Sequence, residues 1–276
     1  MRHKIEVRSV PVALVAGLVY VLLAAGCASS GTPSPVASMS GTGMTGYLSV
    51  EAVPNGLEVL PPPPAPGSAA QAYDESVSRD ALALRNTPRW DLATGDADLT
   101  LPRAADAFSC ALDASVPEAD APHLYLLMRK VGFDASLSTR AAKDQYHRVR
   151  PFVENKKPTC TPGDEEALKG NGSYPSGHTT LGWAWALILA EIAPDRANAI
   201  LPRGLAFGES RVVCNVHWES DVAAGRILGA GLVARLHADP AFLRDLEAAK
   251  VELAAARAKG LKPRRDCAAE RAALAK

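Results

Sequence analysis

The chain has 276 residues, 47% of them hydrophobic and 5% aromatic, and its formal net charge at pH 7 is zero. This length allows one large domain or two small ones, each with a sizeable core. Nothing in this charge balance suggests a nucleic-acid partner, so we expect none. Because Ala and Leu are abundant and aromatic residues are few, the composition favours helices over sheets.

The N-terminus has the pattern of an export signal. Three basic residues, Arg2, Lys4 and Arg8, precede an apolar run over residues 10–25. Because this run is too short to span a membrane comfortably, we predict a signal peptide over residues 1–26. The small residues before Cys27 resemble a bacterial lipoprotein cleavage box, with Ala24 where Leu is more usual. We therefore expect a periplasmic protein attached to the bacterial membrane through a lipidated Cys27; the alternative is ordinary cleavage near Ala28, which gives a soluble periplasmic or secreted form.

A polar and proline-rich stretch follows the signal. Residues 27–46 are rich in Ser, Gly, Thr and Pro, and residues 60–66 form an almost unbroken proline run. This composition predicts a flexible and Pro-rich tether over residues 27–66. The proline run has a second interpretation, in which it wraps the surface of the domain. The domain itself is predicted over residues 67–276, without an internal boundary.

From residue 67 onward the chain has a helical pattern. Apolar spacing and proline positions predict helices over residues 69–84, 101–112, 121–131, 137–149, 178–192, 195–208, 216–237 and 240–259. Residues 154–173 contain two prolines and three glycines and are predicted to form a loop. No stretch alternates convincingly as a strand does, and no apolar run after residue 26 reaches the ~18 residues that span a bilayer.

Four further cysteines, Cys110, Cys160, Cys214 and Cys267, agree with export. An even number in an oxidising compartment predicts two disulfides, and the sequence leaves three pairings open. The alternative is buried free thiols. No CxxC pair occurs, so the sequence gives no support to a zinc site or a thioredoxin-like centre.

Three short motifs carry side chains suited to anion chemistry. The first, called here the basic motif, contains Lys143 and Arg150, the latter followed by Pro151. A separation of seven residues is nearly two helical turns, so the two cations are predicted to project from one helix face. The alternative is a solvated basic face that includes Arg148.

The second, the serine–histidine motif, precedes the apolar helix predicted from residue 178. Pro175 and Gly177 predict a tight turn, and the free N–H groups at the following helix start attract an anion. Ser176 adds a hydroxyl group, and His178 is placed to meet a ligand held there. The alternative is a helix cap with a structural histidine, although a histidine among so many apolar residues needs a partner.

The third, the histidine–aspartate motif, contains Arg211, His217 and Asp221. If the segment is helical, His217 and Asp221 share a face, and the carboxylate accepts the proton of one ring nitrogen. The other nitrogen is then available as a base or nucleophile. Arg211 offers a planar fork suited to an oxyanion such as phosphate. The alternative is a surface helix with an ordinary His–Asp contact.

In chain order the three motifs read Lys-x6-Arg-Pro, Pro-Ser-Gly-His and Ser-Arg-x5-His-x3-Asp. This ordered set resembles the signature of the type 2 phosphatidic acid phosphatase (PAP2) superfamily, which includes vanadium haloperoxidases. The sequences around Ser176 and Arg211, and the proline run, resemble more closely the bacterial class A non-specific acid phosphatases. The resemblance extends over about residues 47–237, and no signature position departs from it.

The resemblance implies an all-α helical-bundle domain that hydrolyses phosphomonoesters of broad specificity without a metal or other cofactor. It assigns His217 as the nucleophile that becomes phosphorylated, Asp221 as the group that orients it, and His178 as the acid that protonates the leaving alcohol. Phosphate would be bound by a set of five residues: Lys143, Arg150, Ser176, Gly177 and Arg211. Phosphate esters are the expected partners, with phosphotransfer as an additional activity, and the sequence leaves a homo-oligomer open. A vanadate-dependent haloperoxidase on the same scaffold is the alternative function.

Overall fold

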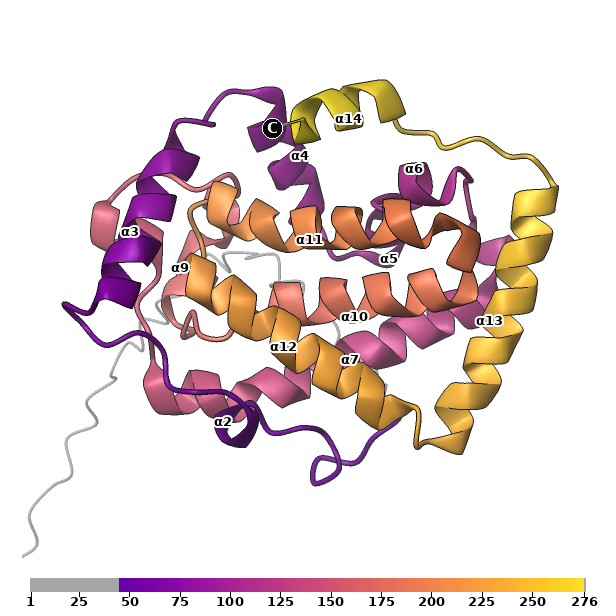
Figure 1. The fold of residues 1–276 in the computed structure, drawn as a ribbon, viewed down its shortest axis with the longest axis horizontal. Helices are drawn as coiled ribbons and strands as arrows, with labels where there is room; N and C mark the ends of the chain where they lie inside the picture. Colours follow the sequence, from indigo (N-terminus) through magenta and orange to yellow (C-terminus); the bar gives the residue numbers. More distant parts are fainter. Residues whose placement is uncertain (1–44, 276) are drawn as a thin grey trace, which may run out of the picture. The chain divides into compact units, whose positions relative to one another are not determined.

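A computed structural model describes residues 45–275, which form helices and contain no strand (Figure 1). The prediction of an all-α fold is confirmed for this part of the chain. The signal peptide and Cys27 lie outside the described residues. Within residues 45–275, no helix combines the length and the apolar character needed to cross a membrane. The helices are α2 (Gly56–Val59), α3 (Ala69–Leu82), α4 (Pro88–Asp96), α5 (Leu101–Asp106), α6 (Ser109–Leu112), α7 (Pro122–Tyr146), α8 (Pro151–Asn155), α9 (Glu165–Lys169), α10 (Gly177–Ile192), α11 (Ala197–Val213), α12 (Glu219–Leu236), α13 (Pro240–Ala258) and α14 (Cys267–Leu274).

Helix α10 is the central element of the bundle and packs against α7, α11, α12 and α13 (Figure 1). It begins where the Ser176 side chain accepts a hydrogen bond from the Thr179 N–H, and it ends at Ile192, two residues before a proline. Most of its side chains are buried because neighbours surround it. Trp185 is one of them, and its indole N–H donates to the Met128 carbonyl of α7 at 3.0 Å.

Glycines allow α12 to approach α10 closely. A Cβ atom on Gly225 would lie 2.7 Å from the Ser176 carbonyl oxygen, and one on Gly229 would lie 2.6 Å from the Thr180 carbonyl oxygen. Side chains at these two positions would push the helices apart. The close approach brings the start of α12 beside the start of α10, where the serine–histidine and histidine–aspartate motifs meet.

Several predicted helix boundaries are wrong. The two helices expected over residues 121–131 and 137–149 are one helix, α7, which ends at Tyr146, while the helix expected over 101–112 is divided into α5 and α6. Helix α12 begins at Glu219 instead of residue 216. The short helices α2, α8 and α9, and the longer α4 and α14, were not predicted. Short helices have too few turns to show a clear apolar period, so local spacing does not reveal them.

Residues 45–66 belong to the folded domain, so the boundary predicted at residue 67 lies too far along the chain. Leu48, Val53 and Leu60 are buried in it. The Tyr47 N–H donates to the buried Asp134 carboxylate at 2.9 Å. At the proline run, the Tyr174 hydroxyl donates to the Pro61 carbonyl at 2.7 Å, as expected of a run that wraps the surface.

The four cysteines form two disulfides, one of the three pairings that the sequence left open. Cys110 pairs with Cys267 across a Cα–Cα distance of 5.5 Å and joins α6 to the start of α14. Cys160 pairs with Cys214 across 4.8 Å. The second disulfide joins the loop after α8 to the end of α11, the helix that carries Arg211.

Candidate active site

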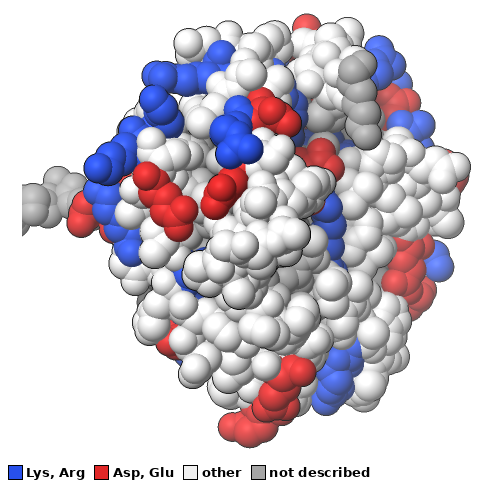
Figure 2. Space-filling model, turned by 60° about the vertical axis from the view of Figure 1, so that its left-hand side comes forward, with Lys and Arg blue, Asp and Glu red and all other residues white. Residues whose placement is uncertain are grey.

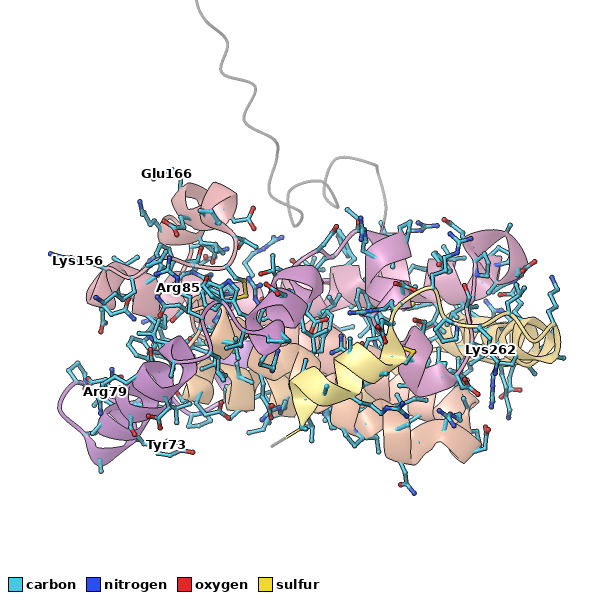
Figure 3. The ribbon with its side chains drawn as sticks, turned by 90° about the horizontal axis from the view of Figure 1, so that it is seen from above. Tyr73, Arg79, Arg85, Lys156, Glu166 and Lys262 are labelled. Carbon is cyan, nitrogen blue, oxygen red and sulfur yellow. A yellow bond between two sulfur atoms is a disulfide. The ribbon has the colours of Figure 1, made fainter. Side chains whose placement is uncertain are left out.

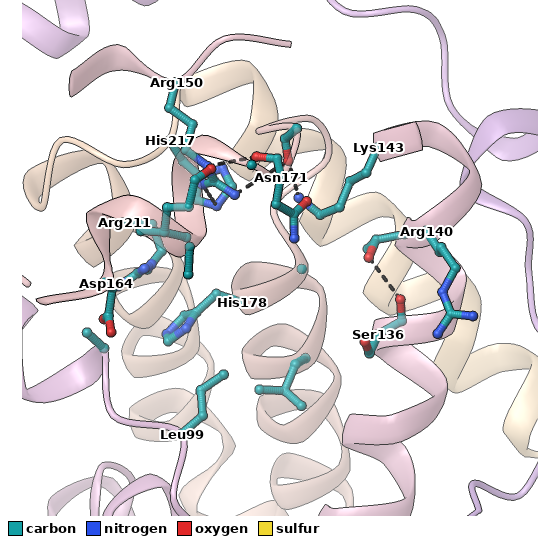
Figure 4. Close-up of a pocket in the computed structure, with 18 of the residues that line it drawn as sticks. Leu99, Ser136, Arg140, Lys143, Arg150, Asp164, Asn171, His178, Arg211 and His217 are labelled. Carbon is teal, nitrogen blue, oxygen red and sulfur yellow. Dashed lines mark hydrogen bonds between the residues drawn. The ribbon is translucent and has the colours of Figure 1, made fainter. Parts of the chain in front are cut away.

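The three motifs meet at a cavity of about 480 Å³ beside the N-terminal end of α10 (Figure 4). Six of the predicted site residues line it: Lys143, Arg150, Gly177, His178, Arg211 and His217. The rest of the lining combines apolar side chains such as Leu99 and Leu181 with the charged Arg140, Asp144 and Asp164. One end of the cavity is therefore strongly cationic, and the rest is mixed.

His217 lies in the turn between α11 and α12, so the prediction that it shares a helix with Asp221 is wrong. Asp221 is the third residue of α12, and its Oδ2 accepts hydrogen bonds from the Trp218 N–H at 2.9 Å and from His217 Nδ1 at 3.2 Å. The predicted contact nevertheless forms, at the entrance of the helix. On the other side of the ring, Nη1 of Arg150 donates to His217 Nε2 at 3.0 Å.

These contacts define the tautomer of His217. Arginine can only donate, so Nε2 must carry a lone pair, and the ring proton is on Nδ1, facing Asp221. Burial lowers the pKa of His217 well below its usual value, and the charges of Arg150, Lys143 and Arg211 lower it further. His217 is therefore neutral, with the lone pair of Nε2 at the cavity.

The two cations of the basic motif do not share a helix face, contrary to the prediction. Helix α7 ends after Lys143, at Tyr146, and His147 then takes a left-handed conformation with φ 42°. Arg150 is the N-cap residue of α8. The turn between the two helices, rather than helical periodicity, brings both cations to the cavity.

Main-chain carbonyls of α9 and of the loop that follows it hold these two cations. Arg150 Nε donates to the Leu168 and Asn171 carbonyls at 2.9 and 3.1 Å, and Lys143 Nζ donates to the Gly172 carbonyl at 2.6 Å. Burial, together with the neighbouring Arg150, lowers the pKa of Lys143 to about 7. Burial also lowers the pKa of Arg150 to about 10, so this side chain stays charged at neutral pH.

Arg211 projects from the last turn of α11 into the cavity (Figure 4). Its side chain is buried, yet Nε and Nη1 have no hydrogen-bond partner within residues 45–275. Burial lowers its pKa to about 10, while the carboxylate of Asp164, on the cavity wall, acts in the opposite direction. A buried guanidinium with two unused donors is suited to an anionic ligand.

The three residues of the serine–histidine motif have different surroundings. Ser176 is fully buried and caps α10, and its N–H donates to the Asp221 carbonyl at 3.0 Å. It is not among the cavity-lining residues of the described chain, whereas Gly177 and His178 are. Ser176 thus joins the second motif to the third, and its predicted contact with phosphate stays a prediction.

The ring of His178 stacks on Phe207, with centroids 4.6 Å apart and planes 16° from parallel. Its Nε2 is buried without a hydrogen-bond partner among residues 45–275. Burial lowers the pKa of His178 well below its usual value, and Arg211 and His217 add to this effect, while the Asp96 carbonyl opposes it. Without a ligand His178 is therefore neutral.

Sequence reasoning missed two residues behind the site. Arg148, interpreted as part of a solvated basic face, is mostly buried and contacts both Asp221 and Asp74 of α3 at 2.7 Å. Asp74 precedes Arg148 by 74 residues, and no local pattern connects them. No three His, Cys, Asp or Glu side chains gather as metal ligands within the described residues, and the expected absence of a metal stays a prediction.

Comparisons with known proteins show the family of this chain. A profile of the PAP2 superfamily matches residues 124–244. The chain is 45% identical to a non-specific acid phosphatase of Providencia stuartii over 209 residues, which are 75% of this chain and 84% of that protein. It is 46% identical to an acid phosphatase of Zymomonas mobilis over 201 residues, 73% of this chain and 76% of that protein. It is also 41% identical to a non-specific acid phosphatase of Salmonella typhimurium over 208 residues, 75% and 83% of the two chains.

The chain therefore belongs to the PAP2 superfamily. Within it, the chain belongs to the bacterial class A non-specific acid phosphatases, as the sequences around Ser176 and Arg211 and the proline run predicted.

Proposed function

We propose that this protein is an acid phosphatase that hydrolyses phosphomonoesters through a phosphohistidine intermediate. The observation that carries the proposal is a neutral His217 with its Nε2 lone pair at a cavity where Lys143, Arg150 and Arg211 converge. Its relatives named acid phosphatase support the reaction class. Fixed cations at such a site stabilise the charge that spreads over the phosphoryl oxygens in the transition state.

In the first step, Nε2 of His217 attacks phosphorus and displaces the alcohol oxygen. A P–N bond forms, the P–O bond to the alcohol breaks, and the Nδ1 proton stays hydrogen-bonded to Asp221. Arg150 now donates to Nε2 at 3.0 Å, so its Nη1 must transfer that hydrogen bond to a phosphoryl oxygen when substrate binds. Arg211 supplies its two unused donors to the other oxygens.

His178 protonates the departing alkoxide and afterwards takes a proton from the water that attacks phosphorus. The P–N bond then breaks, and phosphate leaves with His217 neutral again. Because His178 is neutral without a ligand, it must acquire its proton together with the substrate. The negative charge of the bound phosphate raises the pKa of His178 by offsetting Arg211.

Trapping of the intermediate tests these roles. We expect His217→Gln to form no phosphoenzyme from a labelled aryl phosphate after acid quench. We expect His178→Gln to be labelled normally by the aryl ester, whose alcohol departs without a proton, but not by an alkyl phosphate. Label on His217→Gln, or equal loss of both esters in His178→Gln, would show the roles to be wrong. Hydrolysis that stops in chelator and returns with a divalent cation would contradict the expected metal independence, and halide oxidation by peroxide with vanadate would favour the haloperoxidase alternative.

The same proposal includes export. The basic residues and apolar run of residues 1–25 support a signal peptide, and the small residues before Cys27 support lipidation there. The mature protein then consists of a short tether and a folded domain that begins near Tyr47, in the periplasm and attached to the membrane.

A further inference from the structure

Arg148 bridges two buried carboxylates behind His217. Its Nη1 donates to Asp221 Oδ1 and to the Ser220 hydroxyl, both at 2.7 Å. Its Nη2 donates to Asp74 Oδ2 at 2.7 Å and to Gln71 Oε1 at 2.8 Å. The side chain is 9% exposed, and Arg148 is not among the residues that line the cavity in the described chain. Arg148 therefore acts on the site through other residues and does not touch a substrate bound there.

Asp74 fixes Arg148 from the opposite side. It lies on the buried face of α3, whereas Tyr73 and Arg79 project outward from the same helix (Figure 3). Its Oδ1 accepts the Ser220 N–H at 2.8 Å, and its Oδ2 accepts the Ser220 hydroxyl at 2.5 Å. Ser220 is the second residue of α12, so Asp74 caps the N-terminus of that helix with a carboxylate from a distant segment.

The four side chains form a row of alternating partners, in the order His217, Asp221, Arg148 and Asp74. Each contact in the row is 2.7 to 3.2 Å long. Asp221 therefore divides its negative charge between two donors: Oδ2 faces the ring of His217, and Oδ1 faces the guanidinium. Asp74 keeps that guanidinium from turning wholly toward Asp221.

We propose that Arg148 is a positioning residue for the nucleophile: it holds Asp221 in place and offsets part of the negative charge that Asp221 presents to His217. The inference rests on the proposed function, in which His217 must be neutral to attack. It extends that function by making Arg148 and Asp74 determinants of the pH range in which the nucleophile is available.

Charged or titratable groups from the neighbouring elements act on His217, and the effect of Arg148 must be compared with theirs. They are Asp221 of α12, Arg150 at the start of α8, Lys143 of α7, Arg211 of α11 and His178 of α10. Asp221 is the one carboxylate among these groups. Burial raises the pKa of Asp221, and Arg148 is the first of the groups that lower it.

Loss of the Arg148 charge raises the pKa of Asp221 and, through Asp221, the pKa of His217. The pKa of Asp221 rises, so the carboxylate that orients His217 is protonated at a higher pH. Where Asp221 remains ionised, its charge acts on His217 without the offset of Arg148 and raises the pKa of the imidazole. Both effects remove the productive state from the acidic side, so the acidic limb of the rate profile moves to higher pH.

The test uses Arg148→Gln, which removes the charge but keeps a donor, and Arg148→Lys, which keeps the charge but loses the planar fork. Gln71→Leu is the matched control, because it removes a 2.8 Å hydrogen bond to the same guanidinium without changing any charge. The profile of kcat/KM against pH is measured with an aryl phosphate. The titration of His217 is followed by NMR of protein with 15N-labelled histidine, with His217→Gln used to assign the signal.

We expect the acidic limb and the His217 titration of Arg148→Gln to move upward by about one pH unit or more. Arg148→Lys should move less in the same direction, and Gln71→Leu should follow the wild type. The proposal is overturned if Arg148→Gln melts earlier but keeps the wild-type His217 titration, since Arg148 would then serve stability alone. If Arg148→Gln does not fold, Arg148→Lys decides, and an unchanged titration in it also overturns the proposal. The NMR titration needs no turnover, so it separates failure of this inference from failure of the proposed phosphatase reaction.

Discussion

The pKa of Lys143 predicts the pH at which kcat/KM falls on the alkaline side of the pH profile. Its pKa is lowered to about 7 by burial and by Arg150. A group with a lowered pKa is protonated below that value, so Lys143 carries its charge in acid and loses it as the pH rises through about 7. At pH 8 only about a tenth of the free protein keeps the ammonium, and kcat/KM should be about tenfold below its plateau. Bound phosphate restores the charge, so the corresponding limb of kcat lies at higher pH.

Two substitutions measure this effect. Lys143→Arg keeps a positive charge far above pH 7, so the alkaline limb of kcat/KM should move upward by two pH units or so. Lys143→Met should lower the plateau roughly 10- to 100-fold, the value of a charged hydrogen bond of about 1.5–3 kcal/mol, and should abolish the limb. An aryl phosphate is the right substrate because its departure does not require the proton of His178. An alkaline limb that stays near pH 7 in both variants would refute the assignment to Lys143.

Three further predictions concern the scaffold and the export signal. Gly229→Ala places a Cβ 2.6 Å from a main-chain carbonyl of α10 and should cost about 1–3 kcal/mol of unfolding free energy. Gly231→Ala on the same helix meets open space and should stabilise the protein by up to about 1 kcal/mol. Equal denaturant midpoints for the two variants would contradict the close packing. Replacing both Cys160 and Cys214 by Ser opens a link between residues 54 positions apart and should cost about 4 kcal/mol, measured by urea unfolding. KM should rise as well, because the segment that follows Cys160 holds Lys143 and Arg150 through main-chain carbonyls. An unchanged midpoint would count against the bond. Cys27→Ser should release an active protein from the membrane fraction, and a wild-type protein found only in the soluble periplasm would oppose lipidation.

The chemical character of the site could be predicted because its residue types stand in a fixed order along the chain. Each motif consists of residue types with few chemical roles: cations, a histidine after a tight turn, and a histidine four residues before an aspartate. Helix α10 could also be predicted, since it is apolar on nearly every side and a proline follows its end. The structure brings six of the eight predicted catalytic and phosphate-binding residues to one cavity wall.

The geometry that joins these residues could not be predicted from spacing. Lys143 and Arg150 reach the same cavity because His147 adopts a left-handed conformation that ends α7, and a non-glycine residue takes this conformation uncommonly. Arg148 looked like a surface residue because its partners, Asp74 and Asp221, lie far along the chain. On the face shown in Figure 2, acidic and basic side chains lie close together at the surface. Nothing in the sequence distinguishes such surface charges from the ion pair of Arg148 and Asp74 inside the domain.

The pKa values of His178 and His217 are both lowered, yet the proposed reaction needs His178 to donate a proton. The charge of the substrate reconciles the two. In the empty site burial keeps both rings neutral, helped by Arg150, Lys143 and Arg211 at His217 and by Arg211 at His178. This suits His217 as a nucleophile but leaves His178 without a proton to donate. A phosphate ester brings negative charge to Arg211, which is one of the groups that lower the pKa of His178. His217 is held differently, because Arg150 and Asp221 already determine its tautomer before the ligand arrives. The same ligand therefore promotes protonation of the acid while the nucleophile keeps its lone pair, and two histidines in one cationic cavity can take opposite roles.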